Sequence, residues 1–203
     1  MAAATSGTRF TAGLLDISMS AGVMMMRVRR EDHGPVFFGP PAGTPPQNRF
    51  DAPNGEYRTL YAAASHEGAF VETVLRKPKG RVLRRAFVDQ RVCSIIIPNR
   101  DLRLAKLYDE GLQFHQIDAS LISIDDYTAS RSLALAFYQE FPNLDGIAYR
   151  SRYDNGELCF ALFDRIPSSM LRPIASERFD ANPLRVDYLM RMYGAVFDTS
   201  SSV

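Results

Sequence analysis

Residues 48–76 read NRFDAPNGEYRTLYAAASHEGAFVETVLR, and this stretch decides the fold because a turn, a strand and a helix follow one another within it. Residues 51–55 (DAPNG) indicate a turn, since proline presets φ and both Asn and Gly accept a positive φ at little steric cost. Residues 58–62 (RTLYA) are a short β-branched and aromatic run bounded by turn signals, which predicts a strand.

A helix is predicted over residues 66–76. Ser65 is a suitable N-cap, and a lysine–proline pair follows the far end as a cation and a breaker. On a 3.6-residue period Glu72 lies well off the apolar face of this helix, so its carboxylate is available to a cleft or to solvent. The alternative is an exposed i,i+4 ion pair with Arg76, which contributes about 0.2–0.5 kcal/mol.

Arg49 and Tyr61 are further candidates for contacts with a ligand. Arginine keeps its charge at physiological pH, and its planar fork of donors matches the oxygens of a pyrophosphate. The alternative for Arg49 is an ion pair with Asp51 or with a carboxylate across the turn. Tyr61 follows Leu60 on the predicted strand, so the two side chains face opposite sides of the sheet. Tyr61 either presents its ring and hydroxyl to a ligand or lies half-buried with the hydroxyl in water.

The order of these residues, an arginine, then a tyrosine on a strand, then a glutamate on a helix, resembles the RES domain family, which is named for its arginine, glutamate and serine. A second block, residues 145–165 (DGIAYRSRYDNGELCFALFDR), supplies Ser151 in the matching place. Two ordered blocks far apart in the chain are harder to match by accident than one short pattern. The resemblance covers roughly residues 25–175. From the residues alone, the alternative for Ser151 is an ordinary turn serine.

The resemblance implies an α+β fold with an ADP-ribosyltransferase-like mixed β core and a dinucleotide cleft, flanked by helices. On pattern alone, strands interspersed with helices fit either α+β or α/β. The resemblance also implies an NAD+-consuming toxin of a bacterial RES–Xre toxin–antitoxin pair, held in check by an Xre-like antitoxin. NAD+ is then the substrate, and no cofactor is expected.

In such an enzyme the nicotinamide–ribose bond is cleaved by hydrolysis or phosphorolysis. Positive charge develops on the ribose, much as in glycoside hydrolysis, and the carboxylate of Glu72 is expected to stabilise it. The same cleft is expected to hold three further catalytic and substrate-binding residues: Arg49, Tyr61 and Ser151. Arg27 is a candidate for a phosphate contact, and its alternative is the solvated end of a strand.

Two other functions remain open. One is an ADP-ribosyltransferase that modifies a macromolecule, which requires an open acceptor surface beside Glu72. The other is a non-catalytic module whose arginine-rich strands contact nucleic acid. The chain has 203 residues, 46% of them hydrophobic, and a net charge of +1. One compact domain is therefore expected, and no direct contact with nucleic acid. Association through apolar surface, as a homo-oligomer, is also predicted.

The remaining residues of chemical interest favour plain structural roles. Cys93 and Cys159 lie inside apolar runs, which predicts small buried thiols. His66 is interpreted as an exposed histidine in the first helical turn, and the dispersed histidines and cysteines predict no metal site. The chain has neither an apolar run of about 18 residues nor a basic start followed by an apolar stretch, so no membrane span and a cytoplasmic location are expected.

The sequence predicts that the chain is divided into three segments. Residues 1–22 are expected to be a mobile N-terminal segment, residues 23–198 the RES domain with a C-terminal extension, and residues 199–203 a frayed tail. Within the domain, the proline-rich residues 37–47 are expected to form a loop and a lip over the site. Residues 80–98 are expected to form two short strands around residues 89–90.

Further elements are expected along the chain. Strands are predicted over residues 23–30, 102–107, 146–148 and 158–163, and a helix that begins at Thr128 or Ser130 and ends at Glu140.

Overall fold

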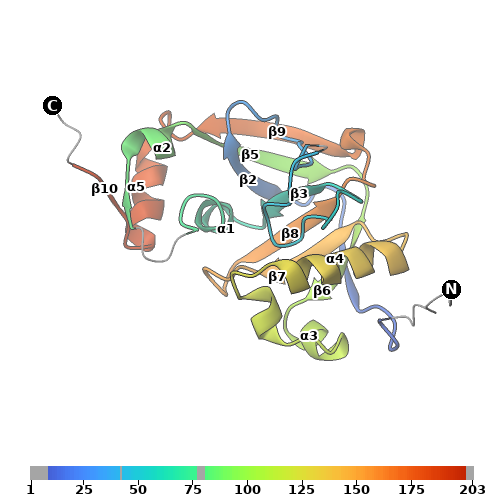
Figure 1. The fold of residues 1–203 in the computed structure, drawn as a ribbon. Coiled ribbons are helices and arrows are strands. Elements are labelled where there is room, and N and C mark those ends of the chain that lie inside the picture. Colours follow the sequence, from blue (N-terminus) through green and yellow to red (C-terminus); the bar gives the residue numbers. More distant parts are fainter. Residues whose placement is uncertain (1–8, 42, 77–80, 200–203) are drawn as a thin grey trace.

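The structure is a computed structural model, and it describes residues 9–41, 43–76 and 81–199. An eight-stranded mixed sheet runs through the molecule in the order β1-β6-β7-β8-β3-β2-β5-β9 (Figure 1). Strands β6 and β7 are parallel, and the other neighbours are antiparallel. The strands are β1 (Asp16–Met19), β2 (Met25–Arg30), β3 (Thr59–Ala63), β5 (Arg91–Pro98), β6 (Leu102–Leu107), β7 (Gly146–Arg150), β8 (Leu158–Phe163) and β9 (Leu171–Arg178).

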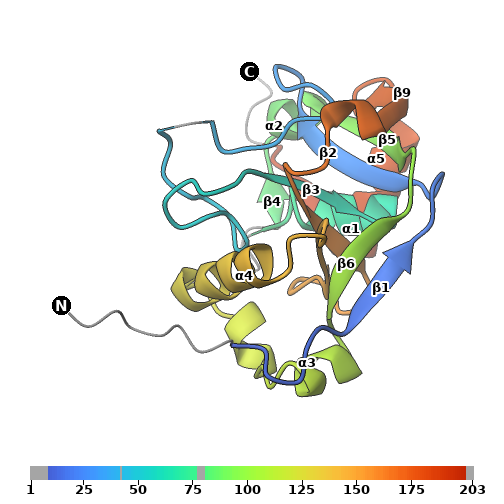
Figure 2. The ribbon, with the colours of Figure 1, turned by 90° about the vertical axis from the view of Figure 1, so that its right-hand side faces the viewer.

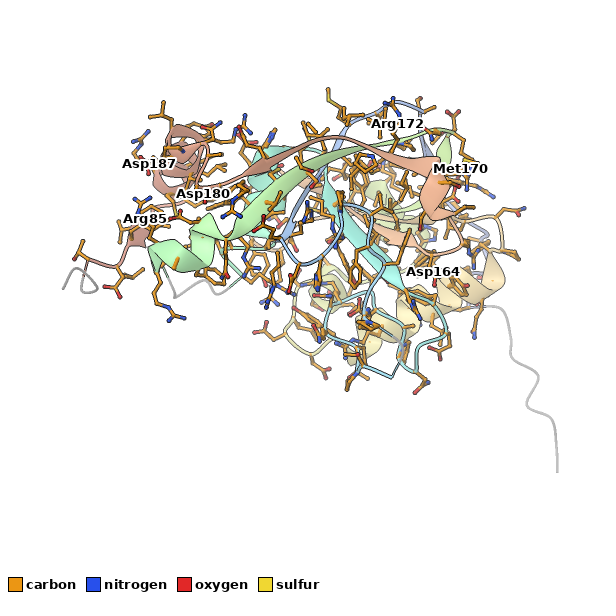
Figure 3. All side chains as sticks on the ribbon, turned by 90° about the horizontal axis from the view of Figure 1, so that it is seen from above. Arg85, Asp164, Met170, Arg172, Asp180 and Asp187 are labelled. Atoms are coloured by element: carbon orange, nitrogen blue, oxygen red, sulfur yellow. The ribbon has the colours of Figure 1, made fainter. Side chains whose placement is uncertain are left out.

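Helices flank this sheet and confirm the predicted α+β class. They are α1 (His66–Val71), α2 (Arg85–Asp89), α3 (Glu110–Phe114), α4 (Thr128–Glu140) and α5 (Pro183–Met192), with 3-10 turns at Ala119–Ile122 and Ser168–Met170. A small parallel sheet joins β4 (Val82–Leu83) to β10 (Val196–Phe197). Helices α2 and α5 and strand β10 gather at one end of the molecule, and α3 and α4 lie away from them (Figures 1 and 2). The labelled residues Arg85, Asp180 and Asp187 mark the first end, and Met170 and Arg172 lie at the other end of β9 (Figure 3).

The sheet opens between β2 and β3. These strands share one registered pair, Met26 with Ala63, whereas β2 and β5 share six pairs and β3 and β8 share five. A cavity lies along this seam, and its walls include residues of both strands. The loss of backbone pairing between β2 and β3 therefore positions the cavity within the mixed β core that the family resemblance implied.

Side chains alternate between two hydrophobic cores, one on each face of the sheet. Phe50, Phe70 and Phe137 belong to the larger core, together with residues of α1, α4 and α5. Leu60 is fully buried in the smaller core, whereas its neighbour Tyr61 packs against the larger one. The prediction that these two side chains face opposite sides is confirmed, and Tyr61 thereby faces the same side as α1.

Helix α1 begins as predicted but ends earlier. Ser65 is the N-cap, and its hydroxyl accepts a 2.9 Å hydrogen bond from the backbone N–H of Gly68. The helix ends at Val71, and Glu72 is its C-cap rather than a residue of the helix interior. The predicted helix over residues 66–76 is therefore too long.

The early end of α1 has a tertiary cause. Thr73 is β-branched, which lowers its helix propensity, and its hydroxyl donates to the backbone carbonyl of Val28 on β2 at 3.4 Å. Beyond it, the guanidinium of Arg76 donates to Oδ1 of Asn48 at 3.0 Å. Glu72 and Arg76 are thus not an i,i+4 pair on one helix, and that alternative is wrong.

The elements formed by residues 81–98 differ from a second prediction. The structure has the short strand β4, helix α2 and the long strand β5 where two strands were expected, and residues 77–80 lie outside the described part. Helix α2 forms because Val88 is fully buried in the larger core while Phe87 lies under the guanidinium of Arg91, 4.5 Å from the ring centroid. Tertiary packing thus overrides a local β propensity, as it often does. The expected strands over residues 102–107 and 158–163 and the helix ending at Glu140 are confirmed.

The N-terminal segment corrects a third prediction. Strand β1 pairs with β6 at the edge of the sheet, with Asp16 opposite Ala105. Phe10 is 5% exposed, and its ring stacks on Phe137 with centroids 4.2 Å apart. Residues 9–22, which we expected to be mobile, therefore join the fold because one aromatic anchor and one edge strand fix them. Residues 1–8 and 200–203 lie outside the described part, and with them almost all of the expected frayed tail.

Candidate active site

A cavity of about 190 Å³ lies at the seam between β2 and β3. Four residues that the sequence singled out line its wall, although they come from different elements: Arg27 on β2, Arg49 on the loop before β3, Tyr61 on β3, and Glu72 at the end of α1. Ser151 follows β7, is fully buried, and lies behind Glu72 rather than on the wall. The structure thus brings all five predicted residues to one place.

Glu72 is held in a fixed position by Ser151. The Ser151 hydroxyl donates a 2.6 Å hydrogen bond to Oε1 of Glu72 and accepts one of 3.1 Å from the backbone N–H of Tyr153. A hydroxyl carries one proton, so that of Ser151 is committed to the carboxylate. In this geometry the Ser151 hydroxyl supports Glu72, and the substrate-binding role expected for Ser151 stays a prediction.

Arg49 is 8% exposed, and its guanidinium lies over the ring of Tyr127, 5.2 Å from the centroid. Within the described residues, its side chain makes no hydrogen bond or ion pair. Helix α4 holds its backbone, since Ser130 donates to the Arg49 carbonyl at 3.0 Å and Arg131 donates to the Asn48 carbonyl at 3.0 Å. Arg49 is therefore a cation that is fixed in place but available to an anionic ligand.

Asp51 is fully buried and forms no ion pair with Arg49, which corrects that alternative. Its carboxylate accepts hydrogen bonds from the backbone N–H groups of Gln47 and Asn48 at 2.8 and 2.7 Å. It also accepts one of 2.9 Å from the hydroxyl of Tyr61. Asp51 thus shapes the loop that carries Arg49 and ties this loop to strand β3.

The hydroxyl of Tyr61 is fully engaged within the protein, since it donates to Asp51 and accepts a 3.0 Å hydrogen bond from the backbone N–H of Phe50. The alternative of a hydroxyl in water is therefore wrong. Burial, reinforced by the charge of Asp51, raises the pKa of Tyr61 well above its usual value. Tyr61 consequently stays protonated and offers a ligand its ring rather than a base.

The three arginines at the end of β2 have different surroundings. Arg29 donates to the Ser94 hydroxyl at 3.0 Å, and Arg30 pairs with Asp32 at 3.0 Å. Arg27 instead lines the cavity, where its Nη1 donates to the Tyr61 carbonyl at 3.2 Å and its buried Nε has no partner within the described residues. Burial, helped by the charge of Arg29, lowers the pKa of Arg27 to about 10. Arg27 therefore stays charged at neutral pH and has an unused donor.

Sequence reasoning missed the aromatic wall of the cavity, which consists of Tyr127, Tyr149 and Tyr153. Burial and the nearby charge of Glu72 raise the pKa of Tyr149 well above its usual value. A signal was available for two of these residues, since the run YRSRY places tyrosines two positions before and after Ser151. Tyr127 precedes α4 and has no comparable signal.

The cysteines and His66 add no chemistry to this cavity. Cys93 and Cys159 are both buried free thiols, as predicted, and burial raises the pKa of Cys93 to about 11. His66 is half-buried rather than exposed, and burial and the charge of Arg185 lower its pKa. In residues 9–41, 43–76 and 81–199 no three His, Cys, Asp or Glu residues gather as potential metal ligands, and no helix is long and apolar enough to span a membrane.

Comparison with known proteins places the chain in a class. The RES domain matches residues 24–182, so the chain belongs to the RES domain family, as the pattern around Arg49, Glu72 and Ser151 predicted. Among solved structures, it is similar to a chain in the crystal structure of the M. tuberculosis MbcT–MbcA toxin–antitoxin complex. The TM-score is 0.67 at 14% identity, with 90% of this chain and 95% of that chain covered. Such a likeness shows a shared fold. The comparison with curated proteins gave no match.

Proposed function

We propose that this chain is the toxin of a toxin–antitoxin pair and that it degrades NAD+ by cleaving the nicotinamide–ribose bond. The observation that carries the proposal is the Glu72 carboxylate, which Ser151 fixes on the wall of a cavity that three arginines also line. Arg76 donates to Asn48, whereas Arg49 and Arg27 keep unused donors. A dinucleotide carries both a pyrophosphate and a ribose linked to a cationic nicotinamide ring. The site offers a partner for each of these charges.

Glu72 is proposed to act on the bond that breaks. As the bond between the ribose carbon and the nicotinamide nitrogen lengthens, its electron pair moves to the nitrogen and positive charge develops on the sugar. A carboxylate that is already oriented stabilises this charge without reorganising during the reaction. Water or phosphate then supplies the electron pair that forms the new bond to the ribose carbon and loses a proton to solvent.

Arg49 and Arg27 are proposed to bind the pyrophosphate. An arginine fork matches two phosphate oxygens at once, and both guanidinium groups retain donors that the described residues do not use. Tyr61 and the three tyrosines of the wall supply flat surfaces against which a ring of the substrate can stack. The pKa values of Tyr61 and Tyr149 are raised, so both of these side chains stay neutral.

The test is the product profile after the purified protein is incubated with NAD+, with and without phosphate. Release of free nicotinamide is expected, with ADP-ribose as the second product if water is the acceptor and a phosphorylated ADP-ribose if phosphate is. Label transferred from NAD+ to a macromolecule would instead establish the ADP-ribosyltransferase alternative. Intact NAD+ together with salt-dependent binding of DNA would favour the non-catalytic module.

We also propose an Xre-like antitoxin as a partner that covers the cavity. The MbcT–MbcA structure, with a chain of similar fold, is of a toxin–antitoxin complex. Addition of the cognate antitoxin should stop NAD+ turnover, and unchanged turnover in the stoichiometric complex would contradict this proposal. Self-association through apolar surface remains a prediction, and a strictly monomeric elution profile at micromolar concentration would contradict it.

A further inference from the structure

A second cavity of about 370 Å³ adjoins the first. Arg27, Asn48 and Tyr61 line both cavities, so these three residues form the partition between them. The outer wall of the second cavity comes from the loop expected to form a lip, and it includes Phe37 and Pro41. The two cavities therefore form one elongated site, and Arg27 is the arginine that lines both of its halves.

The aromatic wall of the second cavity is built by alternation along the loop. Val36 and Phe38 pack against the smaller core, which directs the intervening Phe37 to the other side. The ring of Phe37 stacks on that of His33, with centroids 4.5 Å apart and an interplanar angle of 14°. His33 is itself exposed. Phe37 is thus a large aromatic side chain that lies outside both hydrophobic cores.

The backbone on both sides of this aromatic pair is fixed. Gly39 and Thr59 exchange two backbone hydrogen bonds of 3.0 and 2.8 Å, which pin the loop to β3. A Cβ added to Gly39 would lie 2.9 Å from the Phe37 ring, so the glycine allows the ring its position. The turn before the loop is held by Arg29, which donates to the carbonyl of His33. The aromatic pair is therefore preorganised.

Building on the proposed function, we propose that the second cavity binds the adenine of NAD+ against the Phe37–His33 pair, with Arg27 contacting the pyrophosphate at the junction. A flat, neutral purine suits a wall of aromatic and proline side chains, and the side-chain amide of Gln47 offers a donor and an acceptor for its edge. The partition formed by Arg27, Asn48 and Tyr61 then separates the catalytic Glu72 from the part of the site that binds adenine. Phe37 and His33 set substrate specificity and have no part in breaking the bond.

The first experiment compares kcat/KM for NAD+ with kcat/KM for nicotinamide mononucleotide, which keeps the scissile bond but lacks the adenylate. Phe37→Ala should lower the ratio of kcat/KM for NAD+ to kcat/KM for nicotinamide mononucleotide by about tenfold, the scale of losing one base–aromatic stack. His33→Ala, at an exposed position, should lower the same ratio. Phe37→Trp keeps an aromatic ring and should bring the ratio back to the parent value. An unchanged ratio in both alanine variants would overturn the proposal.

The second experiment measures binding without turnover. Calorimetry with AMP and ADP-ribose should show that Phe37→Ala weakens both ligands, whereas the matched Phe114→Ala variant, on α3 and away from both cavities, should leave them unchanged. If AMP binding depends on Phe37 but NAD+ is not consumed, the adenine subsite stands and the proposed function fails. If NAD+ is consumed and AMP binding ignores Phe37, the subsite fails and the function stands.

Discussion

The hydroxyl of Ser151 donates a 2.6 Å hydrogen bond to Oε1 of Glu72, across 79 positions of sequence. The bond joins the end of α1 to the turn after β7, so the two sequence blocks that suggested the family meet in a single contact. It gives Ser151 the role of a positioning residue, one that acts through the carboxylate.

Removal of this contact should lower kcat more than it changes KM. A hydrogen bond to a charged group contributes about 1.5–3 kcal/mol, so Ser151→Ala should reduce the kcat for nicotinamide release by about tenfold or more. Ser151→Thr retains the hydroxyl and should recover part of the rate. A Ser151→Ala variant with normal kcat and a raised KM would instead indicate direct contact with the substrate.

Tyr61→Phe should reduce stability. The change leaves the backbone N–H of Phe50 and the buried carboxylate of Asp51 each without one partner, which should cost about 1–3 kcal/mol in the free energy of unfolding. Urea unfolding measures this loss. Tyr188→Phe, at a side chain that is 51% exposed, is the control and should stay within about 0.5 kcal/mol of the parent. Equal stability of the two variants would refute the bonding described for Tyr61.

Arg49→Ala should act mainly on binding. Arg49 is expected to contact the pyrophosphate in the ground state as well as in the transition state, so the variant should raise KM for NAD+ by several-fold or more. Arg49→Lys keeps the charge without the planar fork and should lie between the parent and the alanine variant. Steady-state kinetics would contradict the assignment if Arg49→Ala left KM unchanged.

Stability should decline as the pH falls below about 6.5. Burial lowers the pKa of His115 from its usual value of 6.5, so the unfolded chain binds more protons than the folded chain just below that pH. The free energy of unfolding therefore rises with pH through this window and is lost on acidification. The melting temperature should drop by on the order of 2–4 °C for each kcal/mol lost. The melting temperature of the His115→Gln variant should drop less than that of the parent between pH 7.5 and 5.5. An equal drop in both proteins would contradict the assignment to His115.

Much of the site could be predicted because the local elements that carry its residues are each specified by residues that are neighbours in the sequence. The turn, strand and cap that carry Arg49, Tyr61 and Ser65 are each encoded by neighbouring residues. The end of α1 could not be predicted, since it depends on the hydrogen bond from Thr73 to the distant Val28. The partner of Asp51 depends in the same way on tertiary contacts.

Helix α2 and strand β1 were missed for a similar reason. Val88 stabilises α2 only once the larger core exists to bury it, and Phe10 fixes the N-terminal segment through rings that are distant in the sequence, those of His115, Phe137 and Phe141. Tyr127 joins the cavity because α4 brings it over Arg49. Local periodicity holds no information about such contacts.

The most direct test of the central claim compares nicotinamide release from NAD+ by the parent protein and by Glu72→Gln. This change retains shape and removes charge, so turnover should fall by about 10²–10³, the scale of losing one preorganised electrostatic partner, while ADP-ribose binding stays nearly intact. A Glu72→Gln protein that releases nicotinamide at the parent rate would contradict the account.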